Sequence, residues 1–293
     1  MQRDGQEFRN DAARAAGLLC HQQRRAWFGL LALATLYAVA SGCATTGKAR
    51  PVEALTLPPG APSLDEIVAD LRANDEALTD FRAAASFTLT SPRLESVQSF
   101  RSGTVAYRKP ADLYIVGKKN MGVVVFELIS RGPEFLIDFK SVQDVDDRYY
   151  CSFEADDLAN VPFPVAPADI AHEMFSPIDW TKTKDKDIRL TAFDEAAGQA
   201  TLDVALDGGL VRQIVVQGEP WRIVHNTLTD ATGTTLSDTT MDNYQDVDGV
   251  RIPTALEARF PVEETHVTFE LRNVRANTGL PGINFTWDWP PGQ

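Results

Sequence analysis

The chain has 293 residues, 44% of them hydrophobic, and carries 28 basic against 41 acidic side chains, a formal net charge of −13. This length and apolar content are sufficient for one β-rich domain of ordinary size or two small ones. The negative charge repels nucleic acid and anionic lipid headgroups, which argues against a polyanion-binding protein. Any attachment to a membrane must therefore come from a lipid group or from apolar contact.

The N-terminal region has the features of an export signal. Arg24 and Arg25 precede an apolar stretch, residues 27–40, which is short and rich in alanine for a membrane span. The sequence Ala-Ser-Gly then leads to Cys43, and this pattern resembles a bacterial lipoprotein signal. We therefore expect residues 1–42 to be a signal peptide and Cys43 to carry lipid, such as palmitate. The alternative is a plain signal peptide with a chance cysteine.

A tether and one amphipathic helix come next. Residues 43–62 are small and proline-rich, as in a flexible or partly extended linker. Ser63 and Glu66 have the spacing of a capping box, and apolar residues recur at helical spacing after them. The spacing predicts a helix over residues 63–80, with one apolar face that needs a sheet to cover.

Strand-like runs occupy most of the remaining chain. Two short helices, near 153–160 and 166–175, separate an earlier from a later set of runs. Asp207-Gly208-Gly209 and Asp248-Gly249 predict hairpin turns. The predicted strands are residues 82–92, 98–108, 112–118, 122–130, 134–139, 146–153, 187–193, 200–206, 211–217, 221–229, 234–244, 251–260 and 265–275.

This order predicts a mainly β fold with some α, a strongly curved antiparallel half-barrel. A sheet of this width must curl, because wide flat sheets are unusual. The few helices most simply cover its concave face. Six apolar residues of the alternating strands either fill a core or line a lipid-binding cavity: Phe87, Val105, Ile115, Phe126, Phe269 and Leu271.

Several segments in this order are similar to the LolA/LolB-like outer-membrane lipoprotein-localisation superfamily. They are residues 63–88, 107–114, 123–128, 244–253, 271–277 and Phe285. The resemblance implies about eleven strands, helices that form a lid, and a cavity for lipoprotein acyl chains over residues 63–293. It implies a lipid-anchored member at the outer membrane, facing the periplasm, which receives its cargo from a periplasmic carrier protein. Ala44 rather than aspartate after Cys43 agrees with that location.

The resemblance also implies a membrane-contact loop between two strands. Here the loop contains Lys118, Lys119, Met121 and Gly122, with Met121 as the apolar tip. The lysines would reach lipid phosphates while the thioether enters the acyl region. In the alternative, the methionine folds back onto the core.

Other chemistries have little support in the sequence. His172, His225 and His266 are far apart and show no zinc-ligand spacing, and no nucleophile elbow or glycine-rich phosphate loop is present. We therefore expect no enzyme activity, no metal and no cofactor. Two functions remain open: an envelope lipoprotein that binds acyl chains in a hydrophobic cavity, or a scaffolding lipoprotein that docks on an envelope complex without such a cavity.

Overall fold

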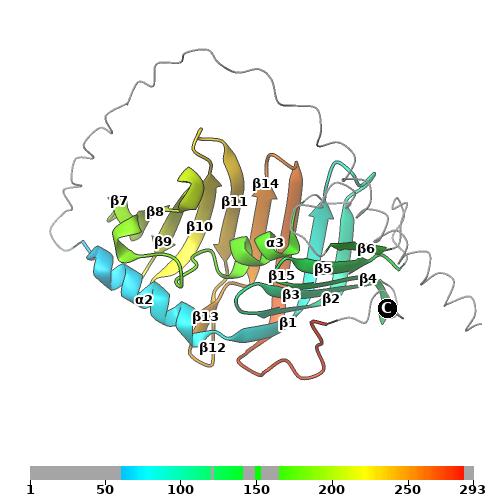
Figure 1. The fold of residues 1–293 in the computed structure, drawn as a ribbon. Coiled ribbons are helices and arrows are strands. Elements are labelled where there is room, and N and C mark those ends of the chain that lie inside the picture. The colour runs from blue at the N-terminus through cyan, green and yellow to red at the C-terminus, as the bar shows by residue number, and fades with distance from the viewer. Residues whose placement is uncertain (1–60, 120–121, 141–148, 153–164, 287–293) are drawn as a thin grey trace, which may run out of the picture. The chain divides into compact units, whose positions relative to one another are not determined.

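The computed structural model describes residues 61–119, 122–140, 149–152 and 165–286 (Figure 1). These residues form two α-helices and fifteen strands. The elements are α2 (Leu64–Ala77), β1 (Asp80–Thr90), β2 (Gln98–Arg108), β3 (Asp112–Lys119), β4 (Val123–Arg131), β5 (Glu134–Asp138), β6 (Tyr149–Ser152), α3 (Pro167–Phe175), β7 (Ile188–Asp194), β8 (Gln199–Ala205), β9 (Val211–Gln217), β10 (Arg222–Thr229), β11 (Thr235–Asp242), β12 (Gln245–Val247), β13 (Val250–Ile252), β14 (Ala255–Phe260) and β15 (Thr265–Ala276).

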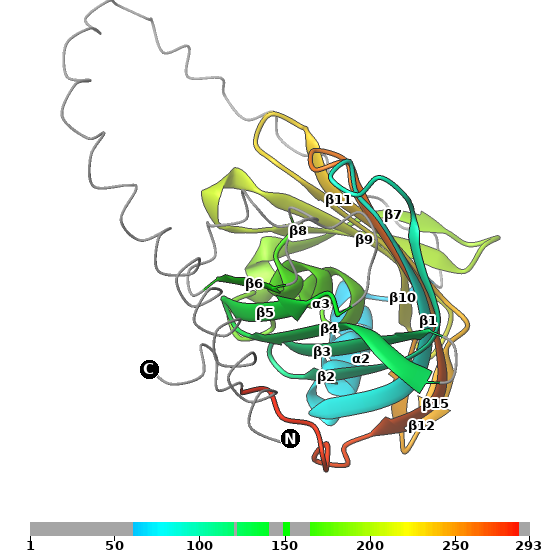
Figure 2. The ribbon, with the colours of Figure 1, turned by 90° about the vertical axis from the view of Figure 1, so that its right-hand side faces the viewer.

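Thirteen of these strands form one antiparallel sheet, in the order β6-β5-β4-β3-β2-β1-β15-β14-β11-β10-β9-β8-β7. The last strand, β15, returns to pair with β1, so the early and late strands meet in the middle of the sheet. The outermost strands, β6 and β7, do not pair with each other among the described residues, so the sheet is curved but not closed into a barrel (Figure 2). The sheet has two strands more than the eleven that the resemblance implies.

Local irregularities accompany the curvature. The β1–β15 register shifts between Arg82 and Ala84, and the β1–β2 register shifts between Ala85 and Phe87. Such β-bulges bend a strand and increase its twist. Gly117 in β3 is required by close packing, because an added Cβ would lie within 2.8 Å of three ring atoms of Phe100.

Most predicted elements are confirmed, with two corrections. Ser63 caps α2 through the predicted capping box with Glu66, and the helix ends at Ala77, three residues early. The predicted strand 251–260 is two strands, β13 and β14, interrupted after Ile252, and β12 was not predicted. Pro253 follows Ile252 and lacks the amide hydrogen that a continuous ladder needs. The predicted helix at 153–160 lies outside the described residues.

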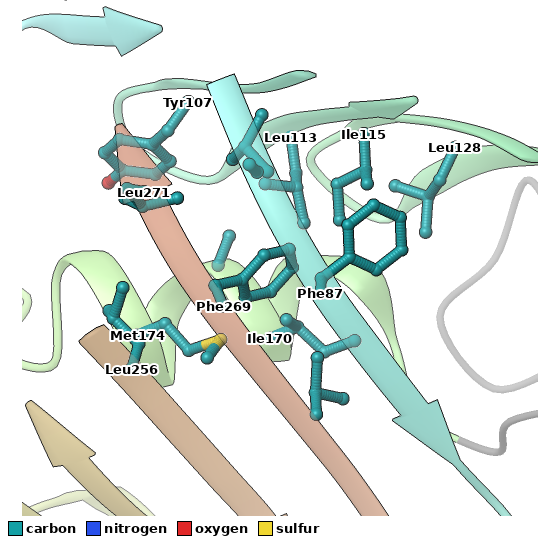
Figure 3. Packing of buried hydrophobic residues seen from close by; sticks show 14 of the residues in the cluster. Phe87, Tyr107, Leu113, Ile115, Leu128, Ile170, Met174, Leu256, Phe269 and Leu271 are labelled. Carbon is teal, nitrogen blue, oxygen red and sulfur yellow. The ribbon is translucent and has the colours of Figure 1, made fainter. Parts of the chain in front are cut away.

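Both helices pack on the same face of the sheet. Cross-strand neighbours point to one face, and one such row joins the middle of the sheet to β8: Val267, Ala258, Thr239, Asn226, Ile214 and Leu202. Ile170 and Met174 of α3 belong to the apolar cluster of the middle strands, as Figure 3 shows, and Ile67 of α2 belongs to the cluster over β8 and β9. Neither helix of the described part is long and apolar enough to cross a membrane.

Candidate functional site

A small pocket lies where α2 and the segment after α3 meet the sheet. It sits at the end of the sheet where β1 and β10 begin, and its cavity volume is about 70 Å³. Most of its lining is apolar or aromatic, including Leu71, Phe81, Trp180, Trp221 and Tyr244. Ligand pockets of drug-sized molecules are usually about 300–1,000 Å³, so an acyl chain would fit here only if the helices move away from the sheet.

The pocket lies between two separate apolar clusters. One cluster covers β1–β5, β14 and β15 with α3, and contains Phe81 and Met174 from the pocket wall. The other covers β7–β10 with α2, and contains Leu71, Ile178 and Trp221 from the same wall. The pocket is therefore bordered by apolar side chains of both clusters.

Polar contacts of α2 hold one wall of the pocket. Asn74 pairs with the backbone of Arg251 in β13, accepting from its amide at 2.8 Å and donating to its carbonyl at 3.2 Å. The Asp70 carboxylate accepts from the Trp221 amide at 2.6 Å and lies 3.1 Å from an Arg251 Nη2. These contacts attach α2 to β13 and to the turn before β10, so any widening of the pocket on this side must break them.

A buried ion pair attaches α3 to the late strands. Arg212 of β9 donates from Nη1 to Glu173 Oε2 at 2.7 Å and from Nη2 to Oε1 at 2.8 Å. Asn226 of β10 donates from Nδ2 to Oε2 at 2.8 Å and accepts from Arg212 Nη1 at 2.7 Å. Glu173 and Arg212 are each 4% exposed, and Asn226 is fully buried. This polar cluster joins α3 to β9 and β10.

The ionised form of Glu173 is favoured despite its burial. Burial alone raises the pKa of a carboxyl, but the hydrogen bonds and positive charge of Arg212, with help from Asn226, hold the pKa of Glu173 below its usual value of 4.5. Sequence reasoning missed this cluster, because its partners are 39 and 53 positions apart. One signal was available: Arg212 occupies the inward phase of β9, which Ile214 and Val216 share.

The six predicted cavity residues come together in one apolar cluster. All are buried, and Phe87 lies near three other rings, with its ring centroid 4.6 Å from Phe100 and 5.5 Å from Phe269. Figure 3 shows Phe87, Ile115, Phe269 and Leu271 among their neighbours. None of the six residues, Val105 and Phe126 included, lines the small pocket. Their role as cavity lining stays a prediction, and the pocket residues were not predicted.

The predicted membrane-contact loop follows β3. Lys118 is half-buried, while Lys119 and Gly122 are exposed. Met121 lies outside the described residues, as does Cys43, so the contact loop and the lipid anchor stay predictions.

The remaining candidate groups lie on the outer face of the sheet, except His172, which is in α3. A wider hollow of about 640 Å³ crosses β2, β1, β15, β14 and β11, with outward-facing Thr88, Thr268, Glu257 and Glu270 along it. Its lining also includes Phe87, Phe100, Leu256 and Phe269, so two of the six predicted cavity residues border this hollow. The hydroxyl and carboxylate groups beside them have no hydrogen-bond partner in an acyl chain. The three described histidines lie in different places, among them His225 beside Asp238 and His266 beside Glu257.

Comparison with known proteins places the fold. No protein-family model and no curated protein matches the sequence. Two solved structures resemble the domain, each covering 75% of this chain and 95% of its own. They are a DUF1329 family protein from Desulfovibrio piger (13% identity, TM-score 0.51) and a domain described as an outer membrane lipoprotein-sorting protein from Vibrio parahaemolyticus (12% identity, TM-score 0.50).

A LolA superfamily protein from Nitrosomonas europaea also matches, at 14% identity and a TM-score of 0.49 over 76% of this chain and 98% of that one. Identities this low establish the fold alone. The predicted fold family is confirmed at that level: the domain has a LolA/LolB-like fold.

Proposed function

We propose that this chain is an envelope lipoprotein that binds an acyl chain between its helices and the buried face of its sheet. Cys43 would carry the lipid anchor, and α2 and α3 would form a lid over the concave face. The role would be reception or insertion of lipids or lipoproteins at the outer membrane, with cargo from a periplasmic carrier. The proposal assigns no chemical step to the chain.

The observation that carries the proposal is the pocket between the two apolar clusters. A ligand that separates α2 from the sheet exchanges apolar contacts for equivalent contacts with its own methylene groups, so the exchange costs little hydrophobic energy. Trp180 and Trp221 line this pocket. They lie within reach of any chain that enters it.

A quenching experiment tests the proposal. The full chain is titrated with a brominated palmitic acid, and tryptophan fluorescence is compared with that in unbrominated palmitic acid. Bromine quenches tryptophan on contact, so we expect saturable quenching that an excess of a diacylated lipopeptide reverses. The Trp180→Phe/Trp221→Phe variant should lose most of the quenching but still compete for the ligand.

The alternative function is a scaffolding lipoprotein without a ligand cavity. Two observations favour it: the pocket is small, and the predicted cavity residues are packed against one another. It predicts no saturable quenching at all. Quenching that persists in the variant lacking both tryptophans would place the ligand elsewhere and would overturn the pocket assignment.

A further inference from the structure

The exposed large aliphatic side chains of the described residues are four valines. Val97, Val123 and Val262 are 57%, 56% and 58% exposed, and Val211 is 37% exposed. Isolated exposed apolar residues are ordinary on protein surfaces. Their distribution on this sheet is unusual, because all four valines lie at one end of the sheet.

The strand pairing establishes this common end. β1 ends at Thr90, which pairs with His266 near the start of β15, so the turn 91–97 with Val97 and the turn 261–264 with Val262 are neighbours. Val123 begins β4, beside Lys119 at the end of β3. Val211 begins β9, paired with Thr229 at the end of β10. In Figure 1 the turns that join β10 to β11 and β14 to β15 lie at the upper edge of the sheet.

We propose that this valine rim (Val97, Val123, Val211 and Val262) rests on the surface of a zwitterionic phospholipid bilayer. The described turns at the opposite end of the sheet, such as 195–198 and 218–220, carry none of the exposed valines. The proposal goes beyond acyl-chain binding, because the pocket lies at that opposite end.

The arrangement suits a fluid surface better than a protein partner. A protein interface has a contiguous, well-packed apolar centre and buries about 800 Å² on each side. The valines instead occur singly, on separate turns of a curved edge, and each would enter a deformable lipid surface independently. Carboxylates lie among them, which argues against anionic lipids: Glu95, Asp207, Asp230, Glu263 and Glu264.

The chain length between the predicted anchor and the domain permits this contact. Twenty residues, 43–62, precede Ser63, and a chain of that length spans at most about 70 Å at roughly 3.3–3.6 Å per residue. A bilayer that holds Cys43 is therefore within reach of the rim. This one step rests on the proposed lipid anchor, while the valine positions do not.

Site-specific fluorescence tests the proposal. The full chain with Cys20, Cys43 and Cys151 replaced by serine receives one new cysteine, by Val97→Cys, Val262→Cys or Ala196→Cys, and an environment-sensitive nitrobenzoxadiazole label. Ala196 is exposed in the turn between β7 and β8, at the opposite end. With phosphatidylcholine vesicles we expect the labels at 97 and 262 to brighten severalfold and shift to the blue, while the label at 196 stays unchanged.

A second set of variants tests whether the valines cause the contact. In the chain labelled at 97, Val262→Glu should lower vesicle partition by about tenfold, whereas Ala196→Glu should have no effect. Equal brightening at 196, or none at 97 and 262, would overturn the proposal. So would brightening that depends on protein concentration without vesicles, since that indicates a second copy. Quenching by brominated palmitic acid should survive Val262→Glu, which separates failure of the rim from failure of the pocket.

Discussion

The buried pair of Glu173 and Arg212 allows a sharp prediction about stability. In Glu173→Leu, the side chain keeps much of its volume, but the Arg212 guanidinium loses both of its hydrogen bonds to the carboxylate. Its Nε already lacks a partner among the described residues, so only the bond to Asn226 Oδ1 would remain. The variant therefore leaves a positive charge buried without an opposite charge.

The expected cost follows from that uncompensated charge. Breaking a buried ion pair by removing one partner costs about 3–5 kcal/mol, and replacing both partners by apolar residues is often neutral or stabilising. For a domain of this size, each kcal/mol lowers Tm by about 2–4 °C. Glu173→Leu should therefore lower Tm by about 6–20 °C, and Glu173→Leu/Arg212→Met should recover most of that loss.

Urea unfolding followed by circular dichroism measures these free energies for the wild type, both single variants and the double variant. The four values form a double-mutant cycle, which isolates the coupling between the two side chains. The reasoning would be refuted by a Glu173→Leu variant within about 1 kcal/mol of the wild type, the range of exposed ion pairs. It would equally fail if the double variant were as unstable as Glu173→Leu.

Two further predictions concern pH and close packing. The folded-state pKa of Glu173 is depressed, so the stability that Glu173 contributes is present above pH 4.5, its usual pKa, and is lost as the pH falls below that value. Unfolding free energies measured against pH should therefore fall more steeply in acid for the wild type than for Glu173→Leu/Arg212→Met. Gly117→Ala should lower the free energy of unfolding by about 1–3 kcal/mol through its clash with the Phe100 ring. Phe100→Leu in the same chain should restore part of that loss in thermal unfolding. A Gly117→Ala variant with unchanged Tm would show that the ring moves aside freely.

Local signals predicted the fold well where one short segment determines the structure. The Ser63–Glu66 capping box and the Asp248–Gly249 turn both depend on residues within a few positions, and both are present. Thirteen strand-like runs match the thirteen strands of the main sheet in number, whereas the family resemblance implied about eleven. The exception is the run 251–260, where the apolar pattern continues across the break after Ile252.

The candidate site was less accessible from the sequence, for a physical reason. The pocket wall combines Leu71 of α2 with Trp221 and Arg251, which come together only when the late strands fold back over the helix. Alternation shows that Phe87 and Phe269 face inward, but it does not show whether the space between inward side chains is filled. In the structure the Phe87 ring stacks on Phe100 and packs in a tilted arrangement against Phe269.

If both the proposed acyl-chain binding and the proposed bilayer contact hold, the opposite placement of the pocket and the valine rim sets a transport distance. β10 has eight residues and begins at the pocket, so at about 3.3 Å per residue its length separates the pocket mouth from the rim by about 25 Å. A bilayer in contact with the rim therefore leaves the mouth in the aqueous layer, open to a soluble donor. An acyl chain released there reaches the bilayer only if the domain tilts over on its tether, or if the chain slides lengthwise beneath α3 toward the rim.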